Sequence, residues 1–163
     1  MRRHPAPEGK TLKSLLKLHW QKQPAVTILT ALLKNPFGYG RIKRNGVGEI
    51  EAIIEETDAR PEEKQIKEIN SGVYLFSAPK LFRSLSLIKP DNIKSEYYLT
   101  DAVRILRDSG ERIAACLAEE PEEVMGVNTP ADLKIVQQVL AGRRLRIKPC
   151  LQAKPHRRKL DAS

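Results

Sequence analysis

The sequence predicts an α/β fold, because short apolar segments typical of strands alternate along the chain with segments of helical periodicity. Residues 25–33 are almost wholly apolar and rich in β-branched side chains, as in a strand buried on both faces of a sheet. Asn45 and Gly46 separate two alternating runs within residues 41–55, which predicts an inserted β-hairpin. The remaining strand-like runs lie at 68–76 and 112–117.

Helical periodicity accounts for the segments between these strands, so we expect a mixed sheet flanked by helices. The first helix is expected from Lys10 to just before Pro24, with apolar residues at i, i+3, i+4 and i+8 forming one buried face. That face would consist of Leu12, Leu15, Leu16 and Trp20. The other helices are expected from Ala78 to about Pro90, from Tyr97 to Ser109, and from Thr129 to about Gly142.

Composition indicates a single globular domain from a reducing compartment. The chain has 163 residues, of which 40% are apolar and 30% are charged. It contains no apolar run near the ~20 residues of a membrane span, and its basic start is not followed by the apolar core of a secretory signal. Its two cysteines do not have metal-ligand spacing. We therefore expect a cytoplasmic protein without a membrane segment.

The positive charge is concentrated at the end of the chain. Residues 143–163 contain eight Lys and Arg residues and one Asp, which gives +7 of the total net charge of +9. Nucleic-acid binding is therefore not expected except through this segment. We expect residues 1–9 to be an irregular lead-in, residues 10–142 to be folded, and residues 143–163 to be a disordered basic tail.

The sequence lacks the Gly-rich loops of nucleotide-binding motifs, Cys/His metal clusters and a recognisable catalytic triad. Three polar or glycine positions in apolar surroundings are more informative. Gly40 would let the backbone approach a ligand closely, or would serve a sharp bend. Glu55 would accept hydrogen bonds from ligand hydroxyls, or would lie at a solvated strand end. Asn70 would bind ligand hydroxyls as donor and acceptor, or would satisfy a turn.

Two further positions lie where helices are expected to begin. Tyr98 and Thr100 offer hydroxyl groups near backbone N–H groups that favour phosphate, although a packed tyrosine and a capping threonine would explain them equally well. Asn128 precedes the expected cap Thr129, so its amide oxygen is a candidate Mg²⁺ ligand. The alternative is that Asn128 caps the helix itself.

Five motifs in order carry a family resemblance. They are Gly38-Tyr39-Gly40-Arg41-Ile42, Ile54-Glu55-Glu56, Glu68-Ile69-Asn70-Ser71-Gly72, Glu96-Tyr97-Tyr98-Leu99-Thr100-Asp101 and Gly126-Val127-Asn128. From about Thr11 to Leu140 the chain resembles the second half of the pyrophosphorylase domain of bifunctional UDP-N-acetylglucosamine pyrophosphorylase/glucosamine-1-phosphate N-acetyltransferases. The resemblance implies a partial Rossmann-like nucleotidyltransferase domain over residues 10–142.

The resemblance also implies a role for each candidate residue. Gly40, Glu55 and Asn70 would contact the N-acetylglucosamine moiety. Tyr98 and Thr100 would line the sugar and phosphate side of the site, and these five residues would bind substrate. Asn128 would be one of two protein ligands to Mg²⁺, the expected cofactor. The substrates would be N-acetylglucosamine-1-phosphate and UTP, and the products UDP-N-acetylglucosamine, used in the bacterial envelope, and pyrophosphate.

The sequence departs from this family in ways that limit its expected activity. The Gly-rich nucleotide loop and the metal-binding aspartate are not in the sequence, and no acetyltransferase repeats follow Leu140. We therefore expect the isolated chain to be inactive, and to associate with itself or with a complementary N-terminal fragment. Two alternatives stay open: a nucleotidyltransferase for another sugar phosphate, and a non-catalytic binding protein that uses its basic tail.

Overall fold

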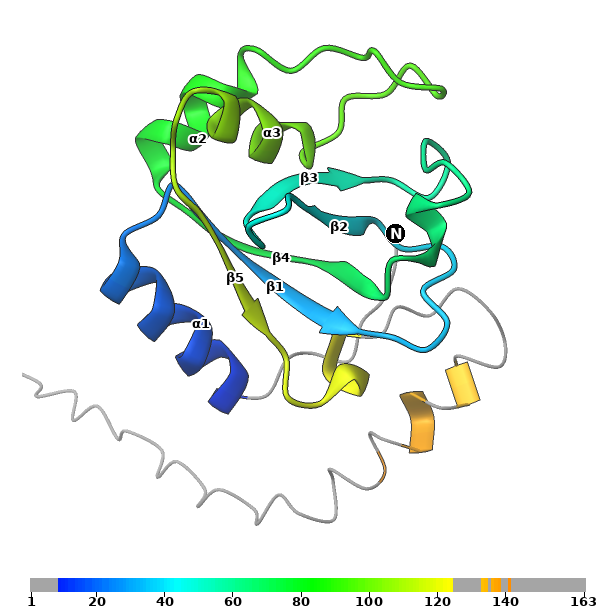
Figure 1. Cartoon of the computed structure of the whole chain (residues 1–163). Helices are drawn as coiled ribbons and strands as arrows, with labels where there is room; N and C mark the ends of the chain where they lie inside the picture. The colour runs from blue at the N-terminus through cyan, green and yellow to red at the C-terminus, as the bar shows by residue number, and fades with distance from the viewer. Residues whose placement is uncertain (1–8, 125–132, 135, 139–140, 142–163) are drawn as a thin grey trace, which may run out of the picture.

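A five-stranded mixed sheet forms the centre of the computed structural model, which describes residues 9–124, 133–134, 136–138 and 141 (Figure 1). The strand order is β3-β2-β4-β1-β5. β1 and β5 are parallel, and the other neighbouring strands pair antiparallel. The strands are β1 (Val26–Leu32), β2 (Arg41–Arg44), β3 (Ile50–Ile54), β4 (Glu68–Phe76) and β5 (Ile113–Leu117). The predicted α/β class and each predicted strand are confirmed.

β1 is buried on both faces because it lies between β4 and β5 and is covered by helices above and below the sheet. Its side chains alternate, as in any strand. Val26 and Ile28 belong to the core that contains α3 (Asp101–Asp108). Leu29 and Ala31 belong to the core that contains the α1 residue Leu15. The continuous apolar run in the sequence therefore supplies two cores from a single strand.

The hairpin predicted from Asn45 and Gly46 joins β2 to β3. The Asn45 Oδ1 atom accepts hydrogen bonds from the backbone N–H groups of Val47, at 3.2 Å, and Glu49, at 2.9 Å. This side chain thus closes the turn, as asparagine commonly does. The hairpin extends the sheet beyond β4 and ends next to the segment that contains Glu55.

Helix α1 (Gly9–Lys22) covers one face of the sheet, and of its predicted buried face only Leu15 is buried (Figure 1). Thr11 and Leu15 are buried, whereas Leu12, Leu16 and Trp20 are exposed, Trp20 to 71%. The helix carries apolar residues around more than one side, so periodicity alone could not identify the side that the sheet covers. The helix begins at Gly9, one residue before the predicted start, and includes Thr11.

Helices α2 (Ala78–Leu85) and α3 pack against each other on the opposite face of the sheet (Figure 1). α3 begins at Asp101, and not at Tyr97 as predicted. Ala102, Val103 and Leu106 form its buried side, whereas Leu99 is 44% exposed and precedes it. Tyr98 and Thr100 are consequently in the segment that leads into the helix.

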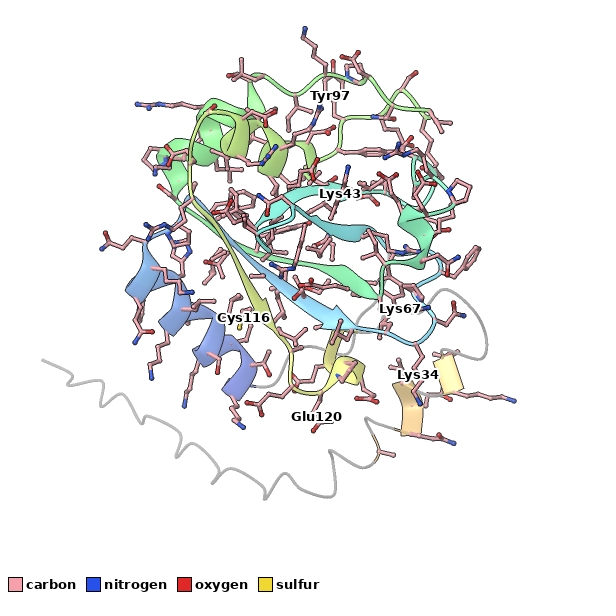
Figure 2. All side chains as sticks on the ribbon, in the orientation of Figure 1. Lys34, Lys43, Lys67, Tyr97, Cys116 and Glu120 are labelled. Atoms are coloured by element: carbon pink, nitrogen blue, oxygen red, sulfur yellow. The ribbon has the colours of Figure 1, made fainter. Side chains whose placement is uncertain are left out.

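The remaining elements are short. Two 3₁₀ turns, η1 (Glu63–Gln65) and η2 (Pro121–Val124), flank the sheet. Cys116 is a half-buried free thiol on β5 (Figure 2). Of the helix expected after Thr129, residues 133–134, 136–138 and 141 are helical. Asn128 and residues 143–163 lie outside the described residues. None of the described helices combines the length and apolar character needed to cross a membrane.

Candidate functional site

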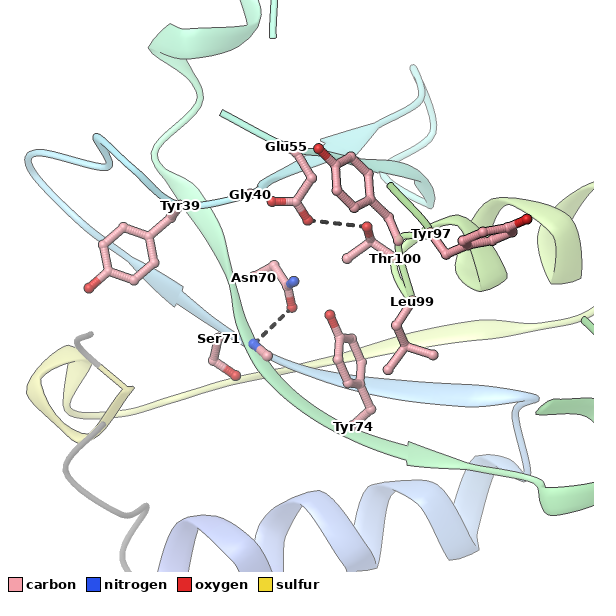
Figure 3. Close-up of a pocket in the computed structure, with 11 residues that line it drawn as sticks. Tyr39, Gly40, Glu55, Asn70, Ser71, Tyr74, Tyr97, Leu99 and Thr100 are labelled. Carbon is pink, nitrogen blue, oxygen red and sulfur yellow. Dashed lines mark hydrogen bonds between the residues drawn. The ribbon is translucent and has the colours of Figure 1, made fainter. Parts of the chain in front are cut away.

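The structure brings five of the predicted site residues together at one pocket of about 270 Å³ (Figure 3). Gly40 immediately precedes β2, and Glu55 immediately follows β3. Asn70 lies in β4, while Tyr98 and Thr100 lie in the segment before α3. Residues from four separate segments therefore line the same hollow, because the sheet order places the hairpin beside β4 and α3 over β3.

Gly40 is at a point of close backbone approach. A Cβ atom at this position would be 3.1 Å from Ile53 Cγ2, 3.4 Å from Glu55 Oε1 and 3.6 Å from Asn70 Cβ. The Gly40 carbonyl accepts a hydrogen bond from the Asn70 N–H at 2.9 Å. Glycine thus keeps the wall of the pocket thin and allows Glu55 and Asn70 to lie beside each other.

Glu55 and Thr100 form a direct contact across the pocket. The Thr100 hydroxyl donates to Glu55 Oε1 at 3.1 Å, and Thr100 makes no side-chain capping hydrogen bond to α3 although it occupies the N-cap position (Figure 3). The hydroxyl therefore orients the carboxylate and does not cap the helix. A carboxylate accepts up to about four hydrogen bonds, so Glu55 keeps capacity for ligand hydroxyl groups.

The Asn70 amide combines the two roles considered from the sequence. Its Oδ1 atom accepts a hydrogen bond from the Gly72 N–H at 3.0 Å, which is the turn contact expected of asparagine (Figure 3). The oxygen keeps a second lone pair and the NH₂ group keeps its donors, so the amide can serve a ligand in the pocket as donor and acceptor. The neighbouring Ser71 anchors the strand from the other side, because its hydroxyl donates to the Leu29 carbonyl at 2.6 Å.

Tyr74 and Leu99 also line the pocket, and sequence reasoning did not select them. Tyr74 is four residues after Asn70 in β4, and its hydroxyl points toward the hollow (Figure 3). Burial raises the pKa of its phenol, with a further increase from the Glu55 charge and an opposing effect of a hydrogen bond from Asn70. The strand period of two, counted from Asn70, was the available signal for this residue.

A buried ion pair supports the loop that carries Gly40. Arg41 is 1% exposed, and its Nη2 atom is 2.8 Å from Glu56 Oε2. The same carboxylate oxygen accepts the Gly38 N–H at 3.0 Å, and Arg41 Nη1 donates to the Tyr39 carbonyl. The two neighbouring glutamates therefore have different roles. Glu56 holds the loop that carries Gly40, and Glu55 lines the pocket.

The described part of the chain does not contain a cluster of three or more His, Cys, Asp or Glu side chains able to hold a metal ion. Asn128, the predicted Mg²⁺ ligand, lies outside that part. Mg²⁺ commonly takes only one or two protein oxygens, with water and substrate phosphates as its other ligands.

The chain is similar to proteins described as bifunctional protein GlmU. It is 45% identical over 135 residues to the protein of Streptococcus suis, a match that covers 83% of this chain and 29% of that protein. It is 47% identical over 135 residues to the protein of Pediococcus pentosaceus, with the same coverage. It is 46% identical over 129 residues to that of Brevibacillus brevis, covering 79% of this chain and 28% of the relative. The chain thus spans less than a third of these relatives. Family models do not match it.

Solved structures confirm the fold. The apo form of a UDP-glucose pyrophosphorylase matches with a TM-score of 0.59 and 20% identity, over 86% of this chain and 50% of that chain. A UDP-glucose pyrophosphorylase complexed with UDP-glucose matches with a TM-score of 0.62 and 20% identity, over 84% and 51%. The predicted Rossmann-like nucleotidyltransferase fold and the predicted resemblance to the bifunctional family are therefore confirmed.

Proposed function

We propose that this chain is the sugar-binding half of a sugar-1-phosphate nucleotidyltransferase domain, most like N-acetylglucosamine-1-phosphate uridylyltransferase. One observation carries the proposal: residues that the family resemblance assigns to substrate binding converge on one pocket. They are Gly40, Glu55, Asn70, Tyr98 and Thr100. The similarity to bifunctional GlmU proteins supports the same reading.

The proposed reaction suits a pocket of this composition. An anionic phosphate oxygen of the sugar-1-phosphate attacks the α-phosphorus of UTP, the bond from that phosphorus to the β-phosphate oxygen breaks, and pyrophosphate leaves. The nucleophile is already charged, so the protein does not have to remove a proton, and catalysis consists of positioning and charge neutralisation. The chain's share is to hold the sugar, with Glu55 accepting from sugar hydroxyls and Asn70 donating to sugar oxygens.

The proposal includes Mg²⁺ as the cofactor, and Asn128 is the one residue of this sequence that we propose as its ligand. When bound, Mg²⁺ neutralises charge on the transferred and leaving phosphates. Asn128 would contribute an amide oxygen, and the other ligands would have to be carboxylates or substrate phosphates. The whole reaction also requires a nucleotide site, for which the sequence has no Gly-rich loop. We propose that a complementary N-terminal fragment supplies it, and that the reaction takes place in the cytoplasm.

Direct binding measurements test the sugar site without requiring turnover. We expect the 163-residue chain to bind N-acetylglucosamine-1-phosphate in isothermal titration calorimetry, and Glu55→Gln to weaken binding at least about tenfold, because hydrogen bonds to charged groups contribute ~1.5–3 kcal/mol. Glu51→Gln is the matched control: it makes the same change on β3 outside the pocket. Absence of binding by the wild-type chain, or equal effects of the two variants, would contradict the proposed site.

Pyrophosphate release tests the activity separately. With UTP, N-acetylglucosamine-1-phosphate and Mg²⁺ we expect the isolated chain to release no pyrophosphate, since the sequence lacks the nucleotide-binding loop. Clear turnover by the purified chain would show that the nucleotide site is present in another form.

A further inference from the structure

The pocket contains a phenol that the five motif residues do not account for. Tyr74 extends from β4 on the same side of the strand as Asn70, and its ring packs against Phe76 with centroids 5.5 Å apart. Its hydroxyl end points into the hollow, between Asn70 and the segment that carries Thr100 (Figure 3). A half-buried phenol directed at a pocket is placed to form a hydrogen bond with a ligand there.

The surroundings of Tyr74 keep its phenol neutral. Burial raises the pKa of the phenol, an interaction with Asn70 opposes this effect, and the Glu55 charge raises the pKa further. A neutral phenol has one O–H to donate, and the Tyr74 hydroxyl faces the pocket (Figure 3). The Tyr74 hydroxyl is therefore placed to donate a hydrogen bond to a ligand.

The two ends of the pocket therefore differ in hydrogen-bonding character. Glu55, held by Thr100, is an acceptor for sugar hydroxyl groups. Tyr74 is a neutral donor, and the apolar side chain of Leu99 lies beside it (Figure 3). A donor next to an apolar side chain matches a group that has both a carbonyl oxygen and a methyl. An acetamido substituent has both, whereas a hydroxyl substituent lacks the methyl and is a weaker acceptor.

We propose that Tyr74 is a specificity-determining residue: its hydroxyl donates a hydrogen bond to the acetamido carbonyl oxygen of the bound sugar, and Leu99 packs against the acetamido methyl group. This inference rests on the proposed function, since it needs a sugar phosphate in the pocket. It adds a reason why an N-acetylated sugar would be preferred to glucose-1-phosphate.

The experiment compares two ligands on matched variants. We expect the wild-type chain to bind N-acetylglucosamine-1-phosphate more tightly than glucose-1-phosphate in calorimetry. Tyr74→Phe, which deletes one hydroxyl and keeps the ring, should lower affinity for the acetylated sugar about three- to tenfold and leave affinity for glucose-1-phosphate unchanged. Ser109→Ala, which removes a hydroxyl bonded to the Ile105 carbonyl at the end of α3, is the control and should leave the preference intact.

Asn70→Asp gives a second readout that keeps the phenol. A carboxylate at this position would accept a hydrogen bond from the Tyr74 hydroxyl in competition with the acetamido oxygen, so the preference should again be lost. Thermal melts establish that each variant is folded. The proposed role of Tyr74 is overturned if the wild type binds both ligands equally, or if Tyr74→Phe and Asn70→Asp keep the wild-type preference. In either case the wild type still binds, so the sugar site itself stands. If the wild type binds neither ligand, the proposed function fails and this inference fails with it.

Discussion

At the scale of single residues, the pocket depends on side chains that bond to the backbone or to each other before any ligand arrives. The Asn70 Oδ1 atom accepts a hydrogen bond from the Gly72 N–H, and the Thr100 hydroxyl donates one to Glu55. Each contact holds its side chain in place, so ligand binding has less side-chain motion to restrict. Gly40 has no side chain, and this leaves room for Glu55 and Asn70 beside it.

The Arg41–Glu56 pair is the residue-scale feature with the largest expected effect on stability. Arg41 Nε is buried and has no hydrogen-bond partner among the described residues, so the guanidinium depends on Glu56 and the Tyr39 carbonyl. A buried ion pair stabilises the fold little more than well-packed apolar residues in its place would. Removing one partner is costly, however, because the other charge is left partly buried.

We expect Arg41→Ala to lower the free energy of unfolding by about 3–5 kcal/mol, because it leaves the Glu56 carboxylate without its closest cation. Urea denaturation followed by circular dichroism measures this. Arg104→Ala, which removes an exposed partner of Asp101, is the control and should change stability by less than about 0.5 kcal/mol. Equal small effects would show that the buried pair does not secure the loop.

At the scale of elements, the boundaries of helices and turns decide which side chains the pocket receives. Because α3 begins at Asp101, Thr100 is free to turn toward Glu55, and Leu99 is available to the pocket. On the other side of the hairpin, η1 supports β2 through an ion pair, in which Glu63 Oε1 lies 3.7 Å from Lys43 Nζ.

Glu63 is expected to make the stability of this turn depend on pH. Its pKa is lowered to about 2 by hydrogen bonds from the Arg60 side chain, at 2.8 Å, and the Arg60 backbone, at 3.0 Å. A carboxylate whose folded pKa lies below its unfolded pKa stabilises the protein above about pH 4.5 and loses this contribution as the pH falls toward 2.

We therefore expect the free energy of unfolding of the wild-type chain to fall between pH 5 and pH 2 by about 1–2 kcal/mol more than that of Glu63→Gln, a value reduced by the solvent exposure of Arg60. Urea titrations at several pH values measure the difference. Glu62→Gln, in an exposed neighbouring ion pair, should follow the wild type. If the stability of Glu63→Gln changed with pH in the same way as that of the wild type, Glu63 would not be the source of the pH dependence.

At the scale of the whole molecule, two surfaces lack cover in the described structure. β5 pairs with β1 on one side only and forms one end of the described sheet (Figure 1). Parallel strands are normally enclosed, and open edges promote association. The second surface is the outward side of α1, where Leu12, Leu16 and Trp20 are exposed. The other side of α1 packs against β1 and β5.

We expect the chain to self-associate as its concentration rises, because the apolar side of α1 is exposed to water. Sedimentation velocity measures this. Leu16→Lys/Trp20→Lys should shift the equilibrium toward monomer. Ser14→Lys/Gln21→Lys adds the same charge at exposed polar positions and should have a smaller effect. A monomer at all concentrations, or equal effects of the two double variants, would exclude α1 as the contact surface.

The sequence by itself determined the type of most elements and five members of the pocket. Strand alternation and the Asn45-Gly46 turn are local signals, so β1, the hairpin and β4 were predictable from neighbouring residues. Gly40, Glu55 and Asn70 were selected because each is unusual in its own surroundings, and the family motifs placed them together.

Only the tertiary structure decided which side of α1 is buried, where α3 begins, that Arg41 pairs with Glu56, and that the side of β4 shared by Asn70 and Tyr74 faces the pocket. Periodicity describes a chain segment in isolation, and it cannot say which neighbour covers which side. Burial of Leu15 instead of Trp20, and the inward turn of Tyr74, follow from the packing of segments distant in sequence. Those contacts exist only once the sheet has assembled.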